Sequence, residues 1–310
     1  MIIDFHVHLS RPEHEQPWVM EWLRSNFTGD PSTTLRPDSE PGSGQSLDAF
    51  LEHVLTPNRF RRYLHENEID WAVGLAEVTP ITTGWASNEY VGEFCAEANA
   101  LPDPATGPRG RLLPFASINP YIVNDLAAEL QHLVDDYGFR GIKIYPVYQY
   151  HYPNEPRMYP LYAKAQELGL PMLVHTGSSV FKGARIKYGD PLLLDDVAID
   201  FPKLIILMAH SGRPFWYEQA FWMARRHENV YMEVSGLPAK KLLDYFPRLE
   251  MLAHKVVYGS DWPGNPDLRR NVEAIHALPI SEEARQAILH DNAARILGLM
   301  RSKHGRFAGE

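Results

Sequence analysis

Residues 204–212 read LIILMAHSG, six apolar residues followed by a histidine and two turn formers. A short apolar run bounded by turn formers is typical of a buried parallel strand. Seven other runs have the same character and begin near residues 2, 70, 112, 141, 171, 229 and 255. Between them lie segments with helical spacing, at 124–137, 159–168 and 237–252, and residues 281–300 are expected to form a closing amphipathic helix.

Eight strands that alternate with helices predict one α/β domain over residues 1–310, a (β/α)8 TIM barrel. From the third run onward the starts are 25 to 33 residues apart, which is the length of a βα repeat. A doubly wound open sheet is the competing architecture. No glycine-rich phosphate turn follows any of the runs, and this favours the barrel.

A long insertion, residues 10–47, separates the first strand from its helix. Its first half, EHEQPWVMEWLRSNF (13–27), can form a short helix. Its second half, TGDPSTTLRPDSEPGSG (28–44), is rich in turn formers and is expected to be mobile. A loop of this length after a barrel strand is either a lid over the site or a tolerated surface insertion.

Composition limits the partners of this chain. The formal net charge is −9, which argues against nucleic acid or an anionic membrane as a partner. No apolar run is long enough to span a bilayer, and no signal peptide is visible. Cys95 is the single cysteine, which suits a reducing compartment. We therefore expect a cytoplasmic protein, with a homodimer as a reasonable possibility.

The first strand contains DFHVHL at residues 4–9. Because side chains alternate along a strand, Asp4, His6 and His8 share one face, and the apolar residues share the other. The outer face of a barrel packs on helices, so His6 and His8 are expected to point inward. Two core histidines that bind nothing would give the same short pattern, so the pair alone decides little.

Three other runs end in residues that can bind metal. His175 is the last residue before the turn formers in PMLVHTG, His210 follows LIILMA, and Asp261 lies in YGSDWP. The carboxyl ends of barrel strands meet at one face, where the active sites of such barrels lie. We therefore predict that His6, His8, His175 and Asp261 hold one divalent metal ion, with His210 beside them. Three imidazoles and a carboxylate suit zinc first, and also manganese, iron or cobalt.

These motifs resemble the amidohydrolase superfamily, which carries H-x-H on its first strand and further histidines and an aspartate on later strands. The spellings DFHVHL, GIKIYP, PMLVHTG, MAHSG, YGSDWP and HDNAARILGL are similar to its amidohydrolase-related group. That group includes aminocarboxymuconate-semialdehyde decarboxylase, resorcylate decarboxylases, dicarboxylate lactonases and uncharacterised metal-dependent hydrolases. The resemblance implies a TIM barrel, the metal ligands predicted above, and His210 as a catalytic histidine or a ligand of a second metal.

Lys143, in GIKIYP, bears on the number of metals. In two-metal relatives a lysine on this strand is carboxylated and bridges the ions. An unmodified Lys143 would instead bind a substrate carboxylate. We favour one metal. Relatives of the TatD nuclease type carry a glutamate on this strand, and its absence argues against a DNA substrate.

We expect a metal-dependent hydrolase of an amide, ester or lactone bond, in which Asp261 takes a proton from water and His210 assists the leaving group. The first alternative is a non-oxidative decarboxylase of an aromatic or unsaturated acid, because the same ligands serve both reactions. The second alternative is a barrel that binds without catalysis.

The loops after the strands suggest a small anionic substrate. Arg213 follows MAHSG and can pair with a carboxylate. Tyr145 and Trp262 follow strand ends and can contact a ring. Solvated charges and loop packing are the plain alternatives for these residues. Glu233 and Ser235, near the end of the seventh run, are expected to support the site rather than to form it.

Overall fold

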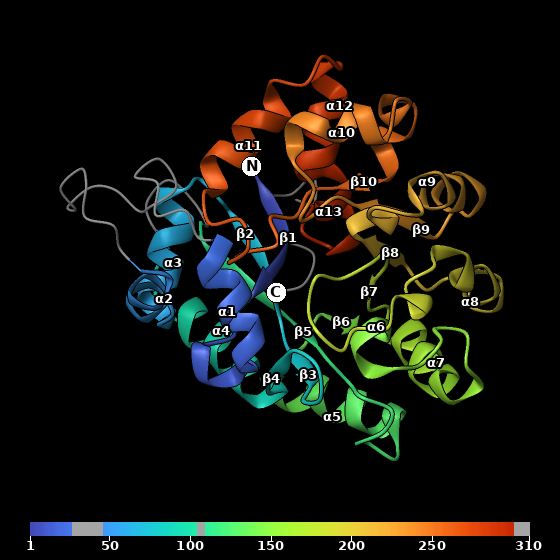
Figure 1. Ribbon diagram of the computed structural model, residues 1–310, viewed down its shortest axis with the longest axis horizontal. Helices are drawn as coiled ribbons and strands as arrows, with labels where there is room; N and C mark the ends of the chain where they lie inside the picture. Colours follow the sequence, from blue (N-terminus) through green and yellow to red (C-terminus); the bar gives the residue numbers. More distant parts are fainter. Residues whose placement is uncertain (27–45, 104–108, 301–310) are drawn as a thin grey trace.

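The structure is a computed structural model, and it describes residues 1–26, 46–103 and 109–300. Eight parallel strands form one sheet in the order β1-β2-β5-β6-β7-β8-β9-β10. They are β1 (Ile3–His8), β2 (Trp71–Leu75), β5 (Arg111–Ala116), β6 (Gly141–Ile144), β7 (Met172–His175), β8 (Ile206–Ala209), β9 (Val230–Glu233) and β10 (Val256–Val257). Each lies in one of the eight predicted runs, and Figure 1 shows them at the centre of a ring of helices.

The sheet closes on itself through backbone hydrogen bonds between β1 and the segment after β10. Phe5 N donates to the oxygen of Tyr258 (3.0 Å), and His8 N donates to the oxygen of Trp262 (2.9 Å). Val7 forms an isolated parallel bridge with Trp262. The architecture is therefore the (β/α)8 TIM barrel that the spacing predicted.

The helices occupy the positions between the strands, with some differences from the sequence prediction. They are α1 (Pro17–Asn26), α2 (Leu47–Val54), α3 (Pro57–Glu66), α4 (Asn88–Asn99), α5 (Leu126–Tyr137), α6 (Pro146–Gln149), α7 (Tyr159–Glu167), α8 (Leu194–Asp200), α9 (Tyr217–Arg226), α10 (Leu242–Tyr245), α11 (Leu268–His276), α12 (Glu282–Gln286) and α13 (Asn292–Ile296). The helix predicted at 237–252 is wrong in extent: only α10 is α-helical, because Pro247 interrupts the segment. The closing helix exists as α12 and α13, joined by a π-helical turn over Ala287–Asp291.

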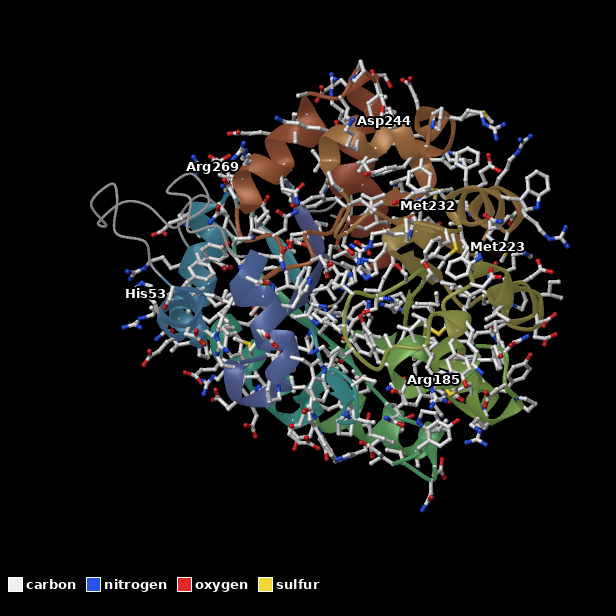
Figure 2. All side chains as sticks on the ribbon, viewed as in Figure 1. His53, Arg185, Met223, Met232, Asp244 and Arg269 are labelled. Atoms are coloured by element: carbon white, nitrogen blue, oxygen red, sulfur yellow. The ribbon has the colours of Figure 1, made fainter. Side chains whose placement is uncertain are left out.

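The barrel interior divides into an apolar end and a polar end. At the amino ends of the strands, Ile3, Phe5 and Leu173 pack with α13 residues Ala293 and Ala294, which plug the barrel. Between the strands and the helices, Met232 of β9 and Met223 of α9 are buried in one apolar layer, whereas Asp244 and Arg269 lie at the periphery (Figure 2). The polar residues of the interior therefore gather at the carboxyl ends of the strands.

β1 departs from simple alternation. Its register against β2 shifts between Asp4 and Val7. Ile3 and Phe5 belong to the interior cluster, whereas Val7 packs outward against α2, α3 and α4. The prediction that Ile3, Phe5 and Val7 share one outer face is therefore wrong, because a bulge turns the strand between them. The same shift brings His6 and His8 to the polar end.

Two additions decorate the barrel on the polar side. The predicted helix in the first half of the insertion is present as α1, whereas residues 27–45, predicted to be turn-rich, lie outside the described residues. A hairpin of β3 (Glu77–Thr79) and β4 (Gly84–Ala86) follows β2 and pairs with Glu15 through Gly84. Within the described ranges, no helix combines the length and apolar character needed to cross a membrane.

Candidate active site

A cavity of about 560 Å³ opens at the carboxyl ends of the strands. Its lining comes from the strand ends, the loops that follow them, and α1. Polar groups at its floor and walls are His8, Glu15, Glu77, His175, His210, Arg213 and Asp261. Residues far apart in the chain thus line one cavity, and cavities of this kind are the usual binding sites of small molecules.

Among the described residues, His6, His8 and Asp261 form one of two groups whose side chains could hold a metal ion. Their ligand atoms all lie within 4.8 Å of one another. His6 Nε2 lies 3.3 Å from His8 Nε2 and 3.4 Å from Asp261 Oδ1, and His8 Nε2 lies 3.6 Å from the same oxygen. Two imidazole nitrogens and a carboxylate oxygen that face one point are a donor set for a divalent cation.

Each of the two histidines has a buried carboxylate behind it. His6 Nδ1 lies 3.2 Å from Glu233 Oε2, and His8 Nδ1 lies 3.3 Å from Glu77 Oε2. Hydroxyls of Thr79 (3.0 Å) and Thr83 donate to the other oxygen of Glu77. A carboxylate at Nδ1 holds the proton there and leaves Nε2 unprotonated, which is the usual arrangement of metal-binding histidines.

The electrostatics of these three residues also fit a cation. Burial lowers the pKa of His6 well below its ordinary value, assisted by the charge of Lys143. Burial would lower the pKa of His8 too, but Asp261 and Glu77 outweigh it and raise that pKa to about 9. Burial raises the pKa of Asp261, but the neighbouring histidines hold it well below its ordinary value. His8 therefore carries positive charge at neutral pH, and the carboxylates of Asp261 and Glu77 that stabilise this charge would equally stabilise a bound cation.

Asp261 is held in an unusual backbone conformation. Its φ is 65°, and His210 and Ser211 are also in the left-handed region, at 61° and 45°. Non-glycine residues adopt this region seldom, and they do so where the surrounding structure enforces it, often at functional sites. Gly236 (φ 63°) lies against Asp261, and a Cβ there would collide with Oδ2 of Asp261 and with Arg213.

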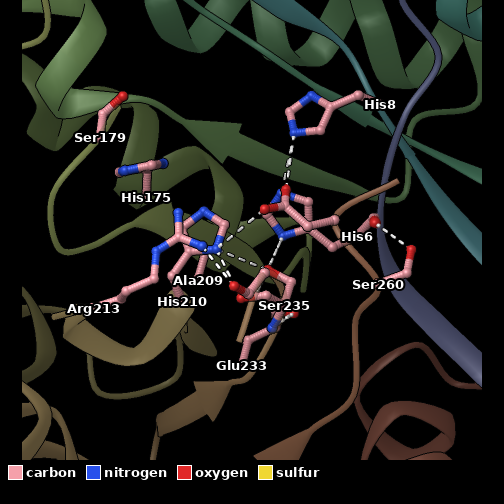
Figure 3. A network of polar contacts seen from close by, with 12 residues as sticks. His6, His8, His175, Ser179, Ala209, His210, Arg213, Glu233, Ser235 and Ser260 are labelled. Atoms are coloured by element: carbon pink, nitrogen blue, oxygen red, sulfur yellow. Dashed lines mark hydrogen bonds and ion pairs between the residues drawn. The ribbon is translucent and has the colours of Figure 1, made fainter. Parts of the chain in front are cut away.

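His210 and His175 lie on the far side of this group (Figure 3). His210 Nδ1 is 3.0 Å from the backbone oxygen of Ser235 and 3.9 Å from Asp261 Oδ2. The His175 ring is 4.7 Å from that of His210, between centroids, but its Nε2 lies 3.2 Å from the backbone oxygen of Ser178. The structure thus brings His175 to the cavity without placing its nitrogens in the group of His6, His8 and Asp261.

Lys143 lies beneath the cavity rather than on its wall. Its side chain is fully buried, and Nζ is 3.4 Å from His6 Nε2. Burial lowers the pKa of Lys143 to about 8, although the charges of Glu233, Asp261 and Glu77 oppose the shift. Contact with a substrate carboxylate, one of the two expected roles, is not supported by this position, because Lys143 is absent from the cavity lining.

The three predicted substrate-binding residues have different surroundings. Tyr145 and Arg213 line the cavity, and Arg213 Nη1 donates to the oxygen of Gly236 (2.8 Å). Trp262 does not line it: its side chain is fully buried, and its ring centroid lies 4.9 Å from that of Phe60. The prediction for Trp262 is therefore corrected: Trp262 pairs with Val7 as a strand neighbour, and its indole packs on the helix side against Phe50 and Phe60.

The insertion supplies one wall of the cavity. Val19, Met20, Trp22 and Leu23 of α1 line it. The Trp22 ring meets Phe181, from the loop after β7, edge to face at 5.5 Å between centroids. Two loops that are distant in sequence therefore meet across the cavity, and this favours the lid interpretation for the described part of the insertion.

Trp22→Ala is expected to raise KM about 3- to 10-fold and to change kcat little, because an aromatic pair contributes roughly 0.5–1.5 kcal/mol beyond the apolar area it buries. Steady-state kinetics with an acid that the protein turns over measures the two constants. Trp85→Ala is the matched control, since Trp85 is 47 % exposed on β4 and is not part of the lining. Equal effects of the two substitutions would argue against a substrate-enclosing role for Trp22.

Sequence reasoning missed the partners of His8. Glu77 lies two residues beyond β2, at the end of the same apolar run, so an acidic residue at a strand end was the available signal. Glu15 gave no such signal, because only the pairing of its segment with Gly84 brings it to the cavity. Burial and the charge of Glu77 raise the pKa of Glu15 to about 8.

The amidohydrolase family pattern matches residues 3–299. Three curated relatives are γ-resorcylate decarboxylases; the one from Rhodococcus jostii (strain RHA1) is 25% identical over 264 residues, covering 69% of this chain and 76% of its own length.

Solved structures share the fold. An uncharacterised TIM-barrel protein from Bordetella bronchiseptica has a TM-score of 0.68 at 24% identity, with 96% of this chain and 98% of that chain covered. A 5-carboxyvanillate decarboxylase from Novosphingobium aromaticivorans, complexed with manganese and 4-hydroxy-3-methoxy-5-nitrobenzoic acid, has a TM-score of 0.62 at 16% identity, with 96% of each chain covered.

These relatives overturn the expectation of hydrolysis. The named curated relatives are decarboxylases, which agrees with the first alternative from the sequence. The physical reason for the error is that both reactions use the same metal ligands and the same strand ends. The motifs therefore identify the candidate metal ligands, but they do not identify which substrate bond is broken.

Proposed function

The chain belongs to the amidohydrolase family, and we propose that it is a divalent-metal-dependent decarboxylase that removes CO2 from a hydroxylated aromatic carboxylic acid. The observation that carries the proposal is the shared activity of the curated relatives, which align with 69% of the chain. The cavity supports it with an aromatic wall, an arginine and a metal-competent group.

In this proposal His6, His8 and Asp261 hold one divalent ion, and His175 joins them once its Nε2 turns away from the backbone oxygen of Ser178. Zinc and manganese are the two candidates, zinc from the donor set and manganese from the decarboxylase neighbour described above. When bound, such an ion supplies positive charge that stabilises the negative charge of a substrate carboxylate and phenolic oxygen. The buried ammonium of Lys143 already provides one charge beside His6, which favours one metal over two.

The side chains at the cavity can orient an aromatic acid. Tyr145 and Tyr148 have ring centroids 6.0 Å apart at 31°, and their hydroxyls donate to Ala76 (2.9 Å) and Ser179 (2.9 Å). Their faces can therefore pack on a substrate ring without leaving a buried hydroxyl unpaired. The guanidinium of Arg213 has further N–H groups that can donate to the substrate carboxylate.

The proton is handled by Asp261 and His210. His210 is neutral, because burial lowers its pKa to about 3, and its Nδ1–H donates to Ser235. Nε2 is then the acceptor for a phenolic proton. Asp261 takes a proton from solvent at Oδ2 and passes it to the ring carbon that bears the carboxylate, and His210 returns the phenolic proton to the product. The C–C bond then breaks, its electron pair restores the ring, and CO2 leaves.

CO2 release tests the proposal. The metal-loaded protein is incubated with γ-resorcylate, with 5-carboxyvanillate, and with benzoate as the control that lacks a hydroxyl. We expect CO2 and the matching phenol, in equal amounts, from at least one hydroxylated acid and none from benzoate. No CO2 from a panel of hydroxylated aromatic acids, with metal content verified, would refute the proposal.

Metal removal is a separate prediction. Dialysis against a strong chelator is expected to abolish CO2 release, and one equivalent of Mn²⁺ or Zn²⁺ is expected to restore it, because the proposal assigns the stabilisation of the substrate's negative charge to the ion. Metal analysis of the protein as isolated identifies the native ion. A stoichiometry near two would contradict the one-metal proposal.

A further inference from the structure

A second cluster lies directly behind the candidate metal ligands, and Ser235 is at its centre (Figure 3). Ser235 Oγ lies 2.9 Å from His6 Nδ1, 3.0 Å from His210 Nδ1 and 2.8 Å from Glu233 Oε2. All of these residues except His210, at 3%, are fully buried. One hydroxyl therefore touches the candidate ligand, the candidate proton-handling histidine and a carboxylate.

This cluster could be taken for a second metal site, since His6, His210 and Glu233 offer ligand atoms within 4.8 Å of one another. The Ser235 hydroxyl argues otherwise. It occupies the point that an ion would need, within hydrogen-bond distance of all three residues. The cluster also lies outside the cavity lining except for His210. It is a hydrogen-bond hub.

The directions of the bonds follow from counting protons. His210 Nδ1 lies 3.0 Å from the Ser235 carbonyl oxygen, which only accepts, so Nδ1 carries the proton. Glu233 Oε1 accepts from Ser235 N (2.8 Å), and Oε2 accepts the single proton of Ser235 Oγ. The lone pairs of Oγ are then available to accept from Nδ1–H of both histidines.

The consequence is one tautomer for both rings. With the proton on Nδ1, the Nε2 atom of each ring is unprotonated. For His6 this is the nitrogen that faces His8 and Asp261. Burial raises the pKa of Glu233 to about 8, and the charge of Lys143 opposes that shift. Both oxygens of Glu233 accept from Ser235, Oε1 from N and Oε2 from Oγ, and this is the arrangement of the carboxylate form that the count requires.

We propose that Ser235 and Glu233 are positioning residues that set His6 and His210 in the Nδ1–H tautomer together, through one shared hydroxyl. This inference rests on the proposed function for the role of His210, whereas its prediction for His6 concerns metal affinity alone. Neither residue contacts the substrate. Their loss removes the constraint on both rings at once.

Glu233→Gln provides the sharpest variant. Ser235 N continues to require an acceptor at Oε1, so the new NH2 group is forced to the Oε2 position. There it donates to Ser235 Oγ instead of accepting from it. His210 Nδ1 carries a proton shared between the carbonyl oxygen and Oγ of Ser235, so it cannot accept the serine proton. That proton must therefore turn to His6 Nδ1, and His6 then carries its own proton on Nε2. A protonated nitrogen cannot bind a metal.

The test measures affinity for Zn²⁺ and for Mn²⁺ by competition with a chromophoric chelator. Ser235→Ala and Glu233→Gln are each expected to weaken binding roughly 10- to 100-fold, the usual effect of losing a hydrogen-bond partner of a ligand. Glu233→Gln is expected to weaken metal binding at least as much as Ser235→Ala does. ¹⁵N chemical shifts of the imidazoles are expected to show the proton on Nδ1 of His6 in the metal-loaded wild type.

Ser211→Ala is the matched control, because Ser211 is equally buried and its hydroxyl contacts only backbone oxygens, of Met208 (3.5 Å) and Glu233 (3.0 Å). Thermal denaturation first checks that both variants are folded. A metal affinity of Ser235→Ala within twofold of that of Ser211→Ala would then overturn the inference. Because the readout is metal binding, a wild type that binds metal but releases no CO2 would refute the proposed reaction and leave the positioning of His6 intact.

Discussion

Asp261→Asn is expected to lower kcat for CO2 release by roughly 10²- to 10⁴-fold, the range for removing a group that transfers a proton in the rate-limiting step. The amide has nearly the same shape, but it cannot take a proton at Oδ2 and pass it on. The substitution also removes the negative charge that faces His6 and His8. Metal affinity is therefore expected to fall as well, and the two effects must be measured separately.

Saturating metal separates them. Kinetics at metal concentrations far above the dissociation constant of the variant report the proton transfer alone. Arg213→Lys is the comparison, since it keeps the charge at the cavity wall but loses the planar donor pair, and it is expected to raise KM more than it lowers kcat. If metal-saturated Asp261→Asn keeps more than a tenth of the wild-type kcat, Asp261 is a ligand and not the proton donor.

Trp262→Ala is expected to lower the free energy of unfolding by about 3–5 kcal/mol, the range for truncating a buried aromatic side chain to alanine. The indole is surrounded by rings: Phe60 lies at 4.9 Å, and Phe50 and Tyr63 each lie at 6.2 Å between centroids. Its removal leaves a cavity where the barrel meets the first helices. Urea denaturation followed by tryptophan fluorescence and by circular dichroism measures the change.

Trp222→Ala is the matched control for this prediction, because Trp222 is 54 % exposed on α9. Its substitution is expected to change the free energy of unfolding by about 0.5 kcal/mol or less. Below the unfolding transition, Trp262→Ala is expected to keep KM within about twofold of the wild type. A large rise in KM with unchanged stability would restore Trp262 as a substrate contact.

The sequence predicted the barrel well because buried parallel strands have an unmistakable pattern of apolar residues. It predicted less well wherever one residue changed the local geometry. Pro247 shortened an expected helix, and the bulge in β1 moved Phe5 inward although perfect alternation placed it outside. Neither a bulge nor the register between strands leaves a trace in apolar periodicity.

The candidate site shows the same division. His6, His8 and Asp261 were recognisable because each lies at or near the carboxyl end of a strand, and the carboxyl ends of all barrel strands meet at one face. Glu15 reaches the cavity through an irregular loop, whose path no periodic pattern encodes. The type of reaction was the hardest feature to predict from the sequence, because the bond that breaks depends on where the substrate binds and not on which metal ligands are present.

The seam of the barrel has a consequence for the order of assembly. Asp4 Oδ1 accepts from Ser260 N across 256 positions of the chain, and Asp261 N donates to the oxygen of His6. The candidate ligands therefore come from the two ends of the ring. Joining segments this distant costs chain entropy that nearby contacts must offset first. A chain still emerging from the ribosome has His6 and His8 long before Asp261, so the proposed metal site is complete only after the ring has closed.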